Sequence, residues 1–500
     1  MTAQVQTIVS TALHEFYFFA GAILLGSLAI SAQVLPAGTA LEVRLSVATG
    51  SRISHDGDPI QATLIAPLSV HGRILVPQGS KVLGSITHAT AIGLGLKHST
   101  ASLSYGFHTL VVMEGIAIPI NAQLVEVETA KEHVDELGIV RGIHAIVSLS
   151  SGVAYCAVPL LLVDPTIGIP VWGVKSVIAP SANPEIHFPT GTELILRLST
   201  AVTLPMPNLK FPVPAKSFSL GELTDIEQLL KDSAQRAYMG SRPSDIVNVM
   251  FLGSRSQLDR AFHASGWSQA QGKSPISLYR MYRALAERYG YPRAPMNKLT
   301  LNGAPSVFVQ QKSLDTVQKR HHVRLWQYPV HENIWLGAAA EDVGFRFELT
   351  HWTHSTDPNI DSERAKIVND LVFVGCVDAA GLLSRHSADL VQDPKAQYPI
   401  VTDGDIAVVR LNDCIQPNVM AGVVGTSASR PRGRMVRALI AFRDDLKRSN
   451  IIFTTYNTLK LLKKNKVERT TPRTPLVNRE PRGLDWLRPT EPLPVRPAGT

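Results

Sequence analysis

A turn followed by a strand occurs twice in this sequence with nearly the same residues, and this repeat limits how the N-terminal part can fold. Residues 35–46 read LPAGTALEVRLS, and residues 188–199 read FPTGTELILRLS. A shorter copy of the turn, PQGS, stands at residues 77–80. Proline fixes one φ angle and glycine supplies the positive φ that such a turn requires. Two matching strand starts, about 150 residues apart, predict one β-barrel or β-sandwich over residues 34–207, interrupted by an insertion.

The predicted insertion covers residues 138–181 and is strongly apolar. Residues 142–163 are almost uninterrupted in apolar character, and this run is long enough to cross a bilayer as a transmembrane helix. Asp164-Pro165 ends the run, and a second, shorter apolar run follows at residues 167–179. Two interpretations stay open: a hairpin buried in the core, and a helical hairpin that enters a membrane or a partner protein.

The N-terminal segment has the pattern of a targeting signal. Residues 18–32, FFAGAILLGSLAISA, resemble the hydrophobic region of a signal peptide with cleavage near Ala32. No Lys or Arg precedes them, so residues 1–33 are predicted to be either a signal peptide or an uncleaved anchor. We therefore expect an exported protein of the cell envelope, membrane-associated or periplasmic. The chain has three cysteines, and Cys376 and Cys414 could pair in an exported protein, which the sequence leaves open.

The C-terminal part is basic and then proline-rich. The chain carries a formal net charge of +8, and we predict a basic extension over residues 414–469 that is either a solvated tail or a segment attracted to anionic lipid. We do not expect nucleic acid as a partner, because no recognised binding motif accompanies this charge. Residues 470–500 are predicted to be disordered, with Trp486 as a docking point. Residues 208–243 are predicted to be a helical connector, with a helical pattern over 222–238.

Most of the unusual polar residues lie in one segment, which begins with RHHVRLW at residues 320–326. As a strand, this segment places His321 on an apolar face with Val323 and Leu325, which predicts a core histidine. Arg320, His322 and Arg324 fall on the opposite face, which is the better candidate for a site.

A second polar segment follows at residues 345–354 and is read as one strand that ends at His354. Asp357-Pro358 then predicts a helix start, with Asp357 as the N-cap. Two functional hypotheses arise here: a divalent metal held by His322, His354 and Asp361 or Asp357, and an anion held by Arg320, Arg324, Arg364 and the helix N-terminus. A third interpretation is a purely structural polar network.

Residues 244–413 resemble the LssY-like C-terminal domain family. The resemblance rests on DIVNVMFLG at 245–253, ASGW at 264–267, RHHVRLW at 320–326, IWLGAA at 334–339, DSER at 361–364 and TDG at 402–404. It implies an envelope setting and no defined activity. Residues 57–86 show a weaker resemblance to the barrel domain of TrbI-type conjugation and type IV secretion proteins, which implies a barrel with an inserted apolar helical hairpin.

The sequence thus predicts a multi-domain protein: an N-terminal all-β barrel or sandwich with an apolar helical hairpin, then an α+β domain and a disordered proline-rich tail. It contains no G-x-S-x-G elbow and no phosphate-binding loop, so it identifies neither reaction nor cofactor. We expect a binding or assembly module of the bacterial envelope, with a membrane, anionic lipid or an envelope protein as partner. The alternative is a phosphate-directed or metal-assisted hydrolase of a lipid or other envelope substrate, with His322, His354 and Asp357 as catalytic residues.

Overall fold

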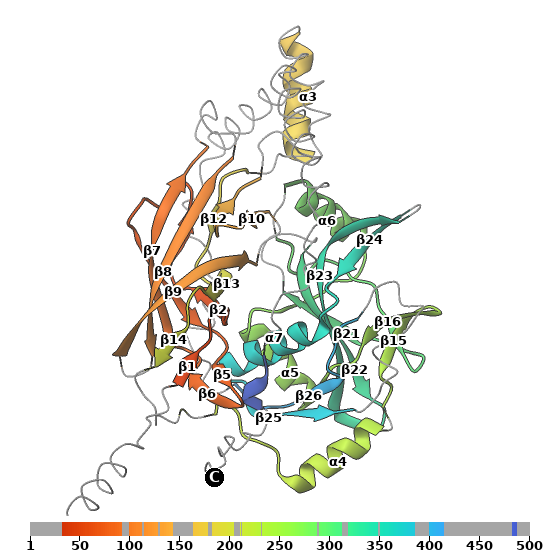
Figure 1. The fold of residues 1–500 in the computed structure, drawn as a ribbon. Helices are drawn as coiled ribbons and strands as arrows, with labels where there is room; N and C mark the ends of the chain where they lie inside the picture. Colours follow the sequence, from red (N-terminus) through yellow and green to blue (C-terminus); the bar gives the residue numbers. More distant parts are fainter. Residues whose placement is uncertain are drawn as a thin grey trace, which may run out of the picture.

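The computed structural model describes most of the chain between residues 33 and 414 and one short C-terminal piece. The described residues are 33–92, 100–112, 115–128, 131–143, 164–178, 183–204, 211, 213–231, 233–287, 290–312, 319–348, 351–385, 400–414 and 483–487. The predicted signal peptide or anchor, the basic extension and most of the proline-rich tail lie outside them. Figure 1 shows a β-barrel beside a second, mixed domain.

The barrel is formed by six strands that close on themselves in the order β8, β7, β4, β2, β13, β9 and back to β8. These strands are β2 (Ala40–Leu45), β4 (Pro59–Leu64), β7 (Lys81–Thr90), β8 (Ser102–Val112), β9 (Ile116–Val127) and β13 (Glu193–Leu198). The two copies of the repeated phrase are β2 and β13, which pair directly as antiparallel neighbours. The predicted barrel is confirmed.

The repeated turn has the same geometry in all three copies. Gly38, Gly79 and Gly191 have φ angles of 90°, 84° and 89°, in the region that glycine tolerates best. In each copy the residue after this glycine donates its hydroxyl to the proline carbonyl at 2.7–2.8 Å. Proline, glycine and a hydroxyl residue are therefore needed together, because each fixes a different part of the turn.

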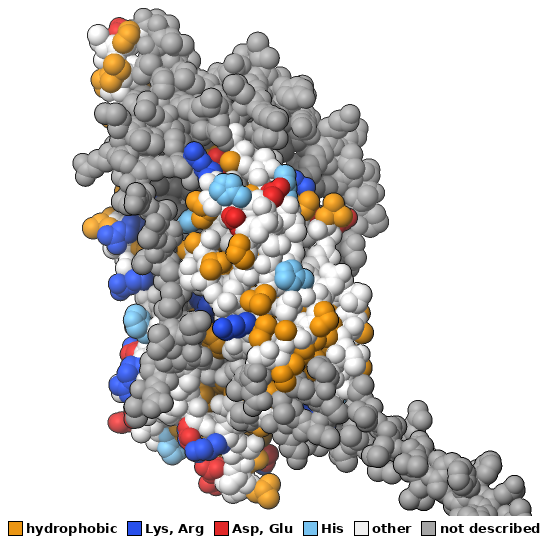
Figure 2. Space-filling model, turned by 90° about the vertical axis from the view of Figure 1, so that its left-hand side faces the viewer, with side chains coloured by type: hydrophobic (Ala, Val, Ile, Leu, Met, Phe, Trp, Pro, Cys, Tyr) orange, Lys and Arg blue, Asp and Glu red, His pale blue; other side chains and the backbone are white. Residues whose placement is uncertain are grey.

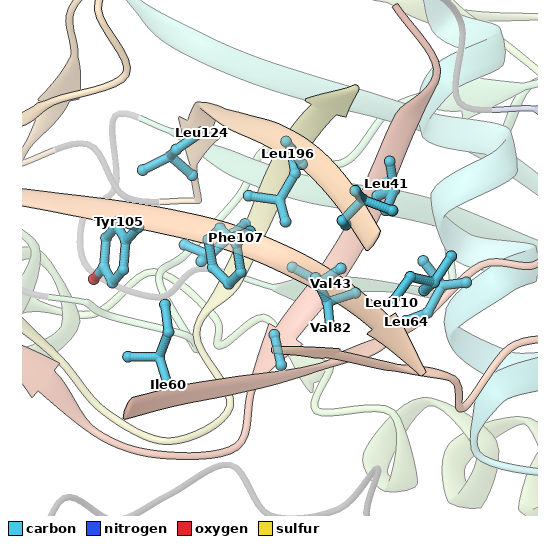
Figure 3. Packing of buried hydrophobic residues seen from close by; sticks show 14 of the residues in the cluster. Leu41, Val43, Ile60, Leu64, Val82, Tyr105, Phe107, Leu110, Leu124 and Leu196 are labelled. Atoms are coloured by element: carbon cyan, nitrogen blue, oxygen red, sulfur yellow. The ribbon is translucent and has the colours of Figure 1, made fainter. Parts of the chain in front are cut away.

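The barrel interior is filled by every second side chain of its strands. In β9, Ile118, Ile120, Ala122 and Leu124 are buried, and the residues between them are exposed. Figure 3 shows Leu41, Leu64, Phe107 and Leu196 pointing from different strands into the same core. This period of two is what a closed sheet requires, because one face lies inside and the other outside.

Four short strand pairs of the described chain lie outside the closed ring of six strands. They are β1 (Gln33–Leu35) with β14 (Val202–Leu204), β3 (Thr49–Gly50) with β12 (His187–Phe188), β5 (Leu68–Val70) with β6 (Arg73–Val76), and β10 (His133–Val134) with β11 (Val140–Arg141). The hairpin β5–β6 lies beside the second domain: Ile74 of β6, and Ile65 just after β4, belong to the core of the second domain and not to the barrel core.

The insertion is described only in part. Helix α3 (Pro165–Ile178) projects away from the barrel in Figure 1 and exposes Ile167, Ile169 and Val174. Residues 144–163, which carry the first half of the predicted hairpin, lie outside the described residues. Among the residues that are described, no helix has both the length and the apolar character needed to span a bilayer.

The second domain is built on a mixed sheet. Its strand order is β18 (Ser268–Gln269), β21 (Phe308–Lys312), β22 (Arg320–Tyr328), β23 (His331–Glu348), β17 (Val249–Leu252), β26 (Asp405–Leu411) and β25 (Val377–Ser384), and β24 (His351–Thr356) also pairs with β23. A smaller sheet holds β15 (Arg236–Met239), β16 (Arg242–Ile246), β19 (Thr300–Leu301) and β20 (Ala304–Pro305). The α+β architecture agrees with the prediction.

Both faces of the large sheet are covered. Val249 and Phe251 of β17 pack with helices α5 (Arg255–Ala264) and α7 (Ile360–Phe373), while Met250 packs on the other face with α4 (Leu220–Lys231). A strand buried on both faces reads as a continuous apolar run, as VMFL does. A further helix, α6 (Pro275–Glu287), lies at the domain edge.

Three local predictions were wrong. The helical pattern over 222–238 ends at Lys231 in α4, and the chain forms β15 from Arg236. The N-cap of α7 is Asn359, whose side chain accepts the Ser362 N–H, because Asp357 instead accepts the N–H of Asn359 in a turn before the helix. Residues 345–354 are not one strand: β23 ends at Glu348 and β24 starts at His351 as its antiparallel neighbour.

Candidate functional site: a buried ionic cluster between the two domains

The repeated barrel strands place two opposite charges side by side on the outer face of the barrel. Arg44 in β2 and Glu193 in β13 are direct cross-strand partners. The Arg44 guanidinium donates to the Glu193 carboxylate at 2.6 Å, and both side chains are almost fully buried. They are buried because α7 of the second domain lies over them, as the 5.3 Å approach of Arg44 to the ring of Phe373 shows.

The second domain contributes two lysines and a carboxylate to the same place. Lys312, at the end of β21, donates to Glu193 at 2.6 Å and to Asp370 at 3.0 Å. Lys366 of α7 donates to Glu193 at 2.5 Å and to Asp370, one turn along the helix, at 3.2 Å. Glu193 therefore receives three cations from two domains.

The pKa values follow from this crowding. Burial raises the pKa of Glu193, but Lys312, Lys366 and Arg44 outweigh it and hold the pKa well below its usual range. Burial likewise raises the pKa of Asp370, and Lys312 and Lys366 lower it further than burial raises it. Both carboxylates are therefore ionised at neutral pH, and Asp370 also accepts the indole N–H of Trp267 at 3.0 Å.

His321 forms the second part of the cluster and also joins the two domains. Its Nδ1 lies 2.7 Å from Glu363 of α7, and its Nε2 lies 2.8 Å from Glu128 of the barrel region. Burial alone lowers the pKa of His321, but Glu128, Glu363 and Glu341 raise it to about 10. The ring is thus an imidazolium at neutral pH and donates to both carboxylates. The prediction of a core histidine on the apolar face is confirmed.

The cluster suits a structural role better than a reaction. The side chains of its five carboxylates and four cations (Glu128, Glu193, Glu341, Glu363, Asp370; Arg44, Lys312, His321, Lys366) are each less than a tenth exposed. General acid–base chemistry requires a group that substrate or water can reach. Buried ion pairs of this kind hold their partners in one arrangement, since separating them leaves uncompensated charge.

Three members of the cluster are grouped as the ligands of a divalent cation would be. Donor atoms of His321, Glu341 and Glu363 lie within 4.8 Å of one another, and all three residues are buried. A metal-bound imidazole must be neutral, whereas the raised pKa of His321 keeps a proton on this ring at neutral pH. A cation would have to displace this proton in order to bind here.

The face predicted to hold the site lies on the other side of β22. Arg320 donates to Asp342 at 2.8 Å, and Arg324 donates to Asp245 and lies 2.8 Å from the Nε2 atom of His322. Arg320, His322 and Arg324 are thus brought together as predicted. Burial raises the pKa of Asp245, but Arg324 and His322 bring it below its usual range. The two guanidinium groups are matched by carboxylates of this chain.

His354 is not brought to this face by the backbone. His322 is opposite Ala340 of β23, and His354 is opposite Phe345, five residues further along that strand. Asp342 pairs with Arg320 on one side and with Thr356 on the other, so β22 and β24 flank β23. Two strand spacings and five residues separate the two histidine backbones by roughly 20 Å. The His354 side chain lies outside what the structure describes.

The remaining predicted residues serve the start of α7. Asp357 accepts the Asn359 N–H at 2.8 Å. Arg364 forms a bidentate pair with Asp403 at 2.8 and 2.9 Å, so a carboxylate of this chain takes the place predicted for an external anion. Asp361 accepts from Thr402 and from the Asp403 N–H at 2.8 and 2.6 Å.

Sequence reasoning missed most of the interdomain cluster. Arg44 and Glu193 stand at positions that strand alternation assigns to the outside of the barrel, where charge is ordinary. Lys366 and Asp370 are four residues apart in α7, which is typical of an exposed helical ion pair. One sequence feature pointed to it: the two repeated strands carry opposite charges, Arg44 and Glu193, at positions that become cross-strand neighbours when the strands pair.

Comparison with known proteins yields two similarities, one to a solved structure and one to a family model. A solved structure of ComB10 from the Com type IV secretion system of Helicobacter pylori is similar over 35% of this chain and 93% of its own length, at 17% identity and a TM-score of 0.21. No curated protein matches the sequence. Residues 230–406 match the family model described as LssY C-terminus, which confirms the resemblance predicted for residues 244–413: the second domain of this chain is similar to the LssY C-terminal family.

Proposed function

We propose that this chain is a non-enzymatic binding or assembly module of the bacterial cell envelope. In this proposal, the barrel and the LssY-like domain act as one rigid unit that presents a surface to a membrane or an envelope protein. The observation that carries it is the buried ionic cluster, in which Glu193 and His321 use charged groups of both domains for internal pairing. Such pairing fixes the relative position of two domains and leaves these groups no external substrate.

The outer wall of the barrel supports a role in binding. Strands β8 and β9 present their outward side chains over a broad uncharged area: Ser104, Gly106, His108, Val111, Ala117, Pro119, Asn121, Gln123 and Val125. A groove lies on this wall, with His108, Asn121 and Gln123 along it. In Figure 2 this side of the barrel is mostly white and orange, with scattered charges. Depletion of charge is typical of the centre of a protein interface.

The pairing of Cys376 and Cys414 supports the proposed location. The two residues flank β25 and β26 and form a disulfide that joins neighbouring strands. Disulfides persist in oxidising compartments and are rare in the bacterial cytosol. An exported chain with a paired Cys376 is therefore the self-consistent interpretation.

Location and redox state can be tested together. The full chain with a C-terminal tag is expressed in a Gram-negative host, the cells are fractionated, and free thiols are alkylated with and without reductant. We expect the protein in the envelope fraction, with two thiols labelled only after reduction. The control lacks residues 2–33 and should stay in the cytosol with all its thiols labelled directly. The same cytosolic result for the full chain would refute the proposed location.

The hydrolase alternative is tested with the same preparation. Turnover of p-nitrophenyl phosphate and of phosphatidic acid is measured for the wild type and for His354→Ala, with and without added Zn²⁺ or Mg²⁺. We expect background rates in every case. Turnover by the wild type that His354→Ala abolishes, at an unchanged melting temperature, would overturn the module proposal.

A further inference from the structure

Five residues of the proline-rich C-terminal stretch are docked on the body of the protein. Gly483 to Leu487 read GLDWL and contain the short 3-10 helix η4 (Asp485–Leu487). Leu484 is 5% exposed and Trp486 3% exposed, and both belong to the core cluster of the second domain. The predicted disorder therefore does not hold for these five residues, and the predicted docking by Trp486 is confirmed.

This segment packs at the junction between the two domains. Helix η4 contacts the hairpin β5–β6 of the barrel region and strand β25 of the second domain. Ile65 and Ile74 come from the barrel side of the same apolar cluster, and Phe373 from α7. In Figure 1 the dark blue turn of η4 lies where β5, β6 and β25 meet. A single short segment thus touches both halves of the molecule.

The segment is anchored in the way that short peptides are anchored in grooves. The Trp486 indole N–H donates to the Asn369 side chain at 3.2 Å, which satisfies its one polar atom in the buried seat. A large aromatic ring with its polar atom paired is the usual centre of such an interface. Leu484 provides a second apolar anchor two residues before it. Leu484 and Trp486 are therefore the two buried anchors of the segment.

The segment is joined to the rest of the described domain only through residues 415–482. This connection of about 70 residues links the segment covalently to the body of the protein, so docking is an intramolecular event. Tethering also gives the segment a high effective concentration at the groove, so even a modest intrinsic affinity keeps it docked.

We propose that the groove between hairpin β5–β6, α7 and β25 is a docking site for a short L-x-W peptide, filled in cis by residues 483–487 of the same chain. Docking of this segment clamps the barrel to the second domain. Docking of the segment depends on the contacts of Leu484 and Trp486 and not on where in the cell the protein resides.

The first test asks whether residues 483–487 occupy the docking site in the full chain and so compete with an added peptide. A fluorescein-labelled peptide of residues 481–490 is titrated by anisotropy into the wild type and into the double variant Leu484→Ala/Trp486→Ala. We expect the variant to bind the peptide at least tenfold more tightly, because its own tail no longer competes. The same peptide with Trp486→Ala should not bind. Equal binding by both folded proteins, or equal binding by both peptides, would overturn the docking site.

The second test does not depend on how the variant folds. A protease site is placed between residues 470 and 480, and the folded wild-type chain is cleaved there. The C-terminal fragment should co-elute with the body on gel filtration and be displaced by excess peptide of residues 481–490. Immediate loss of the fragment would refute docking. A dimer mass by light scattering that becomes monomeric in Trp486→Ala would refute docking in cis, since the tail would then belong to a second copy.

Discussion

Replacing Glu193 by glutamine should destabilise the protein and weaken the coupling between the unfolding of its two domains. The substitution keeps the size of the side chain and removes the charge that faces Arg44, Lys312 and Lys366 at 2.5–2.6 Å. Three cations then share the carboxylate of Asp370 in a site where Glu193 and its partners are less than a tenth exposed. Removing one partner from a buried charge cluster costs about 3–5 kcal/mol, a large part of the roughly 5–15 kcal/mol by which proteins are stable.

The assay is differential scanning calorimetry at pH 7, supported by urea unfolding followed by tryptophan fluorescence. We expect the wild type to unfold with the barrel and second domain coupled, and Glu193→Gln to melt earlier and to resolve two transitions. Loss of coupling is expected because Arg44 and Glu193 belong to the barrel while Lys312, Lys366 and Asp370 belong to the second domain.

The matched control is Asp259→Asn. Asp259 pairs with Arg255 one turn away in α5, and both side chains are about two-fifths exposed. An exposed pair of this kind contributes under about 0.5 kcal/mol. If Glu193→Gln changes stability no more than Asp259→Asn does, the idea that the cluster couples the domains is refuted. The double variant Glu193→Gln/Lys312→Met should recover part of the loss, because it removes one of the unbalanced cations.

Three further predictions follow from the same contacts. The carboxylates around His321 outweigh burial and raise its pKa to about 10, against about 6.5 for a free histidine. The proton on His321 therefore stabilises the fold fully below pH 6.5, and this stabilisation is lost as the pH rises toward 10. The melting temperature of His321→Gln should depend less on pH between 6.5 and 10 than that of the wild type, and an unchanged dependence would count against the imidazolium. Reducing the Cys376–Cys414 disulfide, which closes a sequence separation of 38 residues, should cost roughly 3–4 kcal/mol, measured as the loss of urea stability in Cys376→Ser; no loss would mean that the pair is not formed in solution. Adding EDTA or Zn²⁺ at pH 7 should leave the melting temperature within about 1 °C of the untreated protein, since a proton stabilises the carboxylates at His321; a large Zn²⁺-dependent rise would show a metal site there.

Much of the barrel could be predicted from the sequence, because its determinants are local. The proline-glycine-hydroxyl turns specify their own geometry, and alternation in β2 and β13 states which side chains face inward. The same holds for His321, which alternation in β22 assigns to the apolar face together with Val323 and Leu325. These features depend on neighbouring residues in the chain, so a single sequence is sufficient to identify them.

The hairpin after Glu348 could not be predicted in the same way. The polar residues on either side of it continue one alternating pattern, so residues 345–354 read as a single strand with His354 on the same face as Arg346 and Glu348. The chain instead reverses between β23 and β24, and the register separates His354 from His322. Pattern alone does not distinguish one long strand from two short ones when no glycine or proline marks the reversal.

The outer face of the barrel shows where sequence information ends. Local periodicity determined that Arg44 and Glu193 point away from the barrel core, and in isolation that means toward water. Only the tertiary structure decided that α7 and Lys312 of the second domain cover them, and that Trp486 from the C-terminal stretch packs at the same junction. The reason is physical: a strand or helix encodes which of its faces is apolar, but the burial of a charged face depends on a partner surface whose matching charges lie hundreds of residues away.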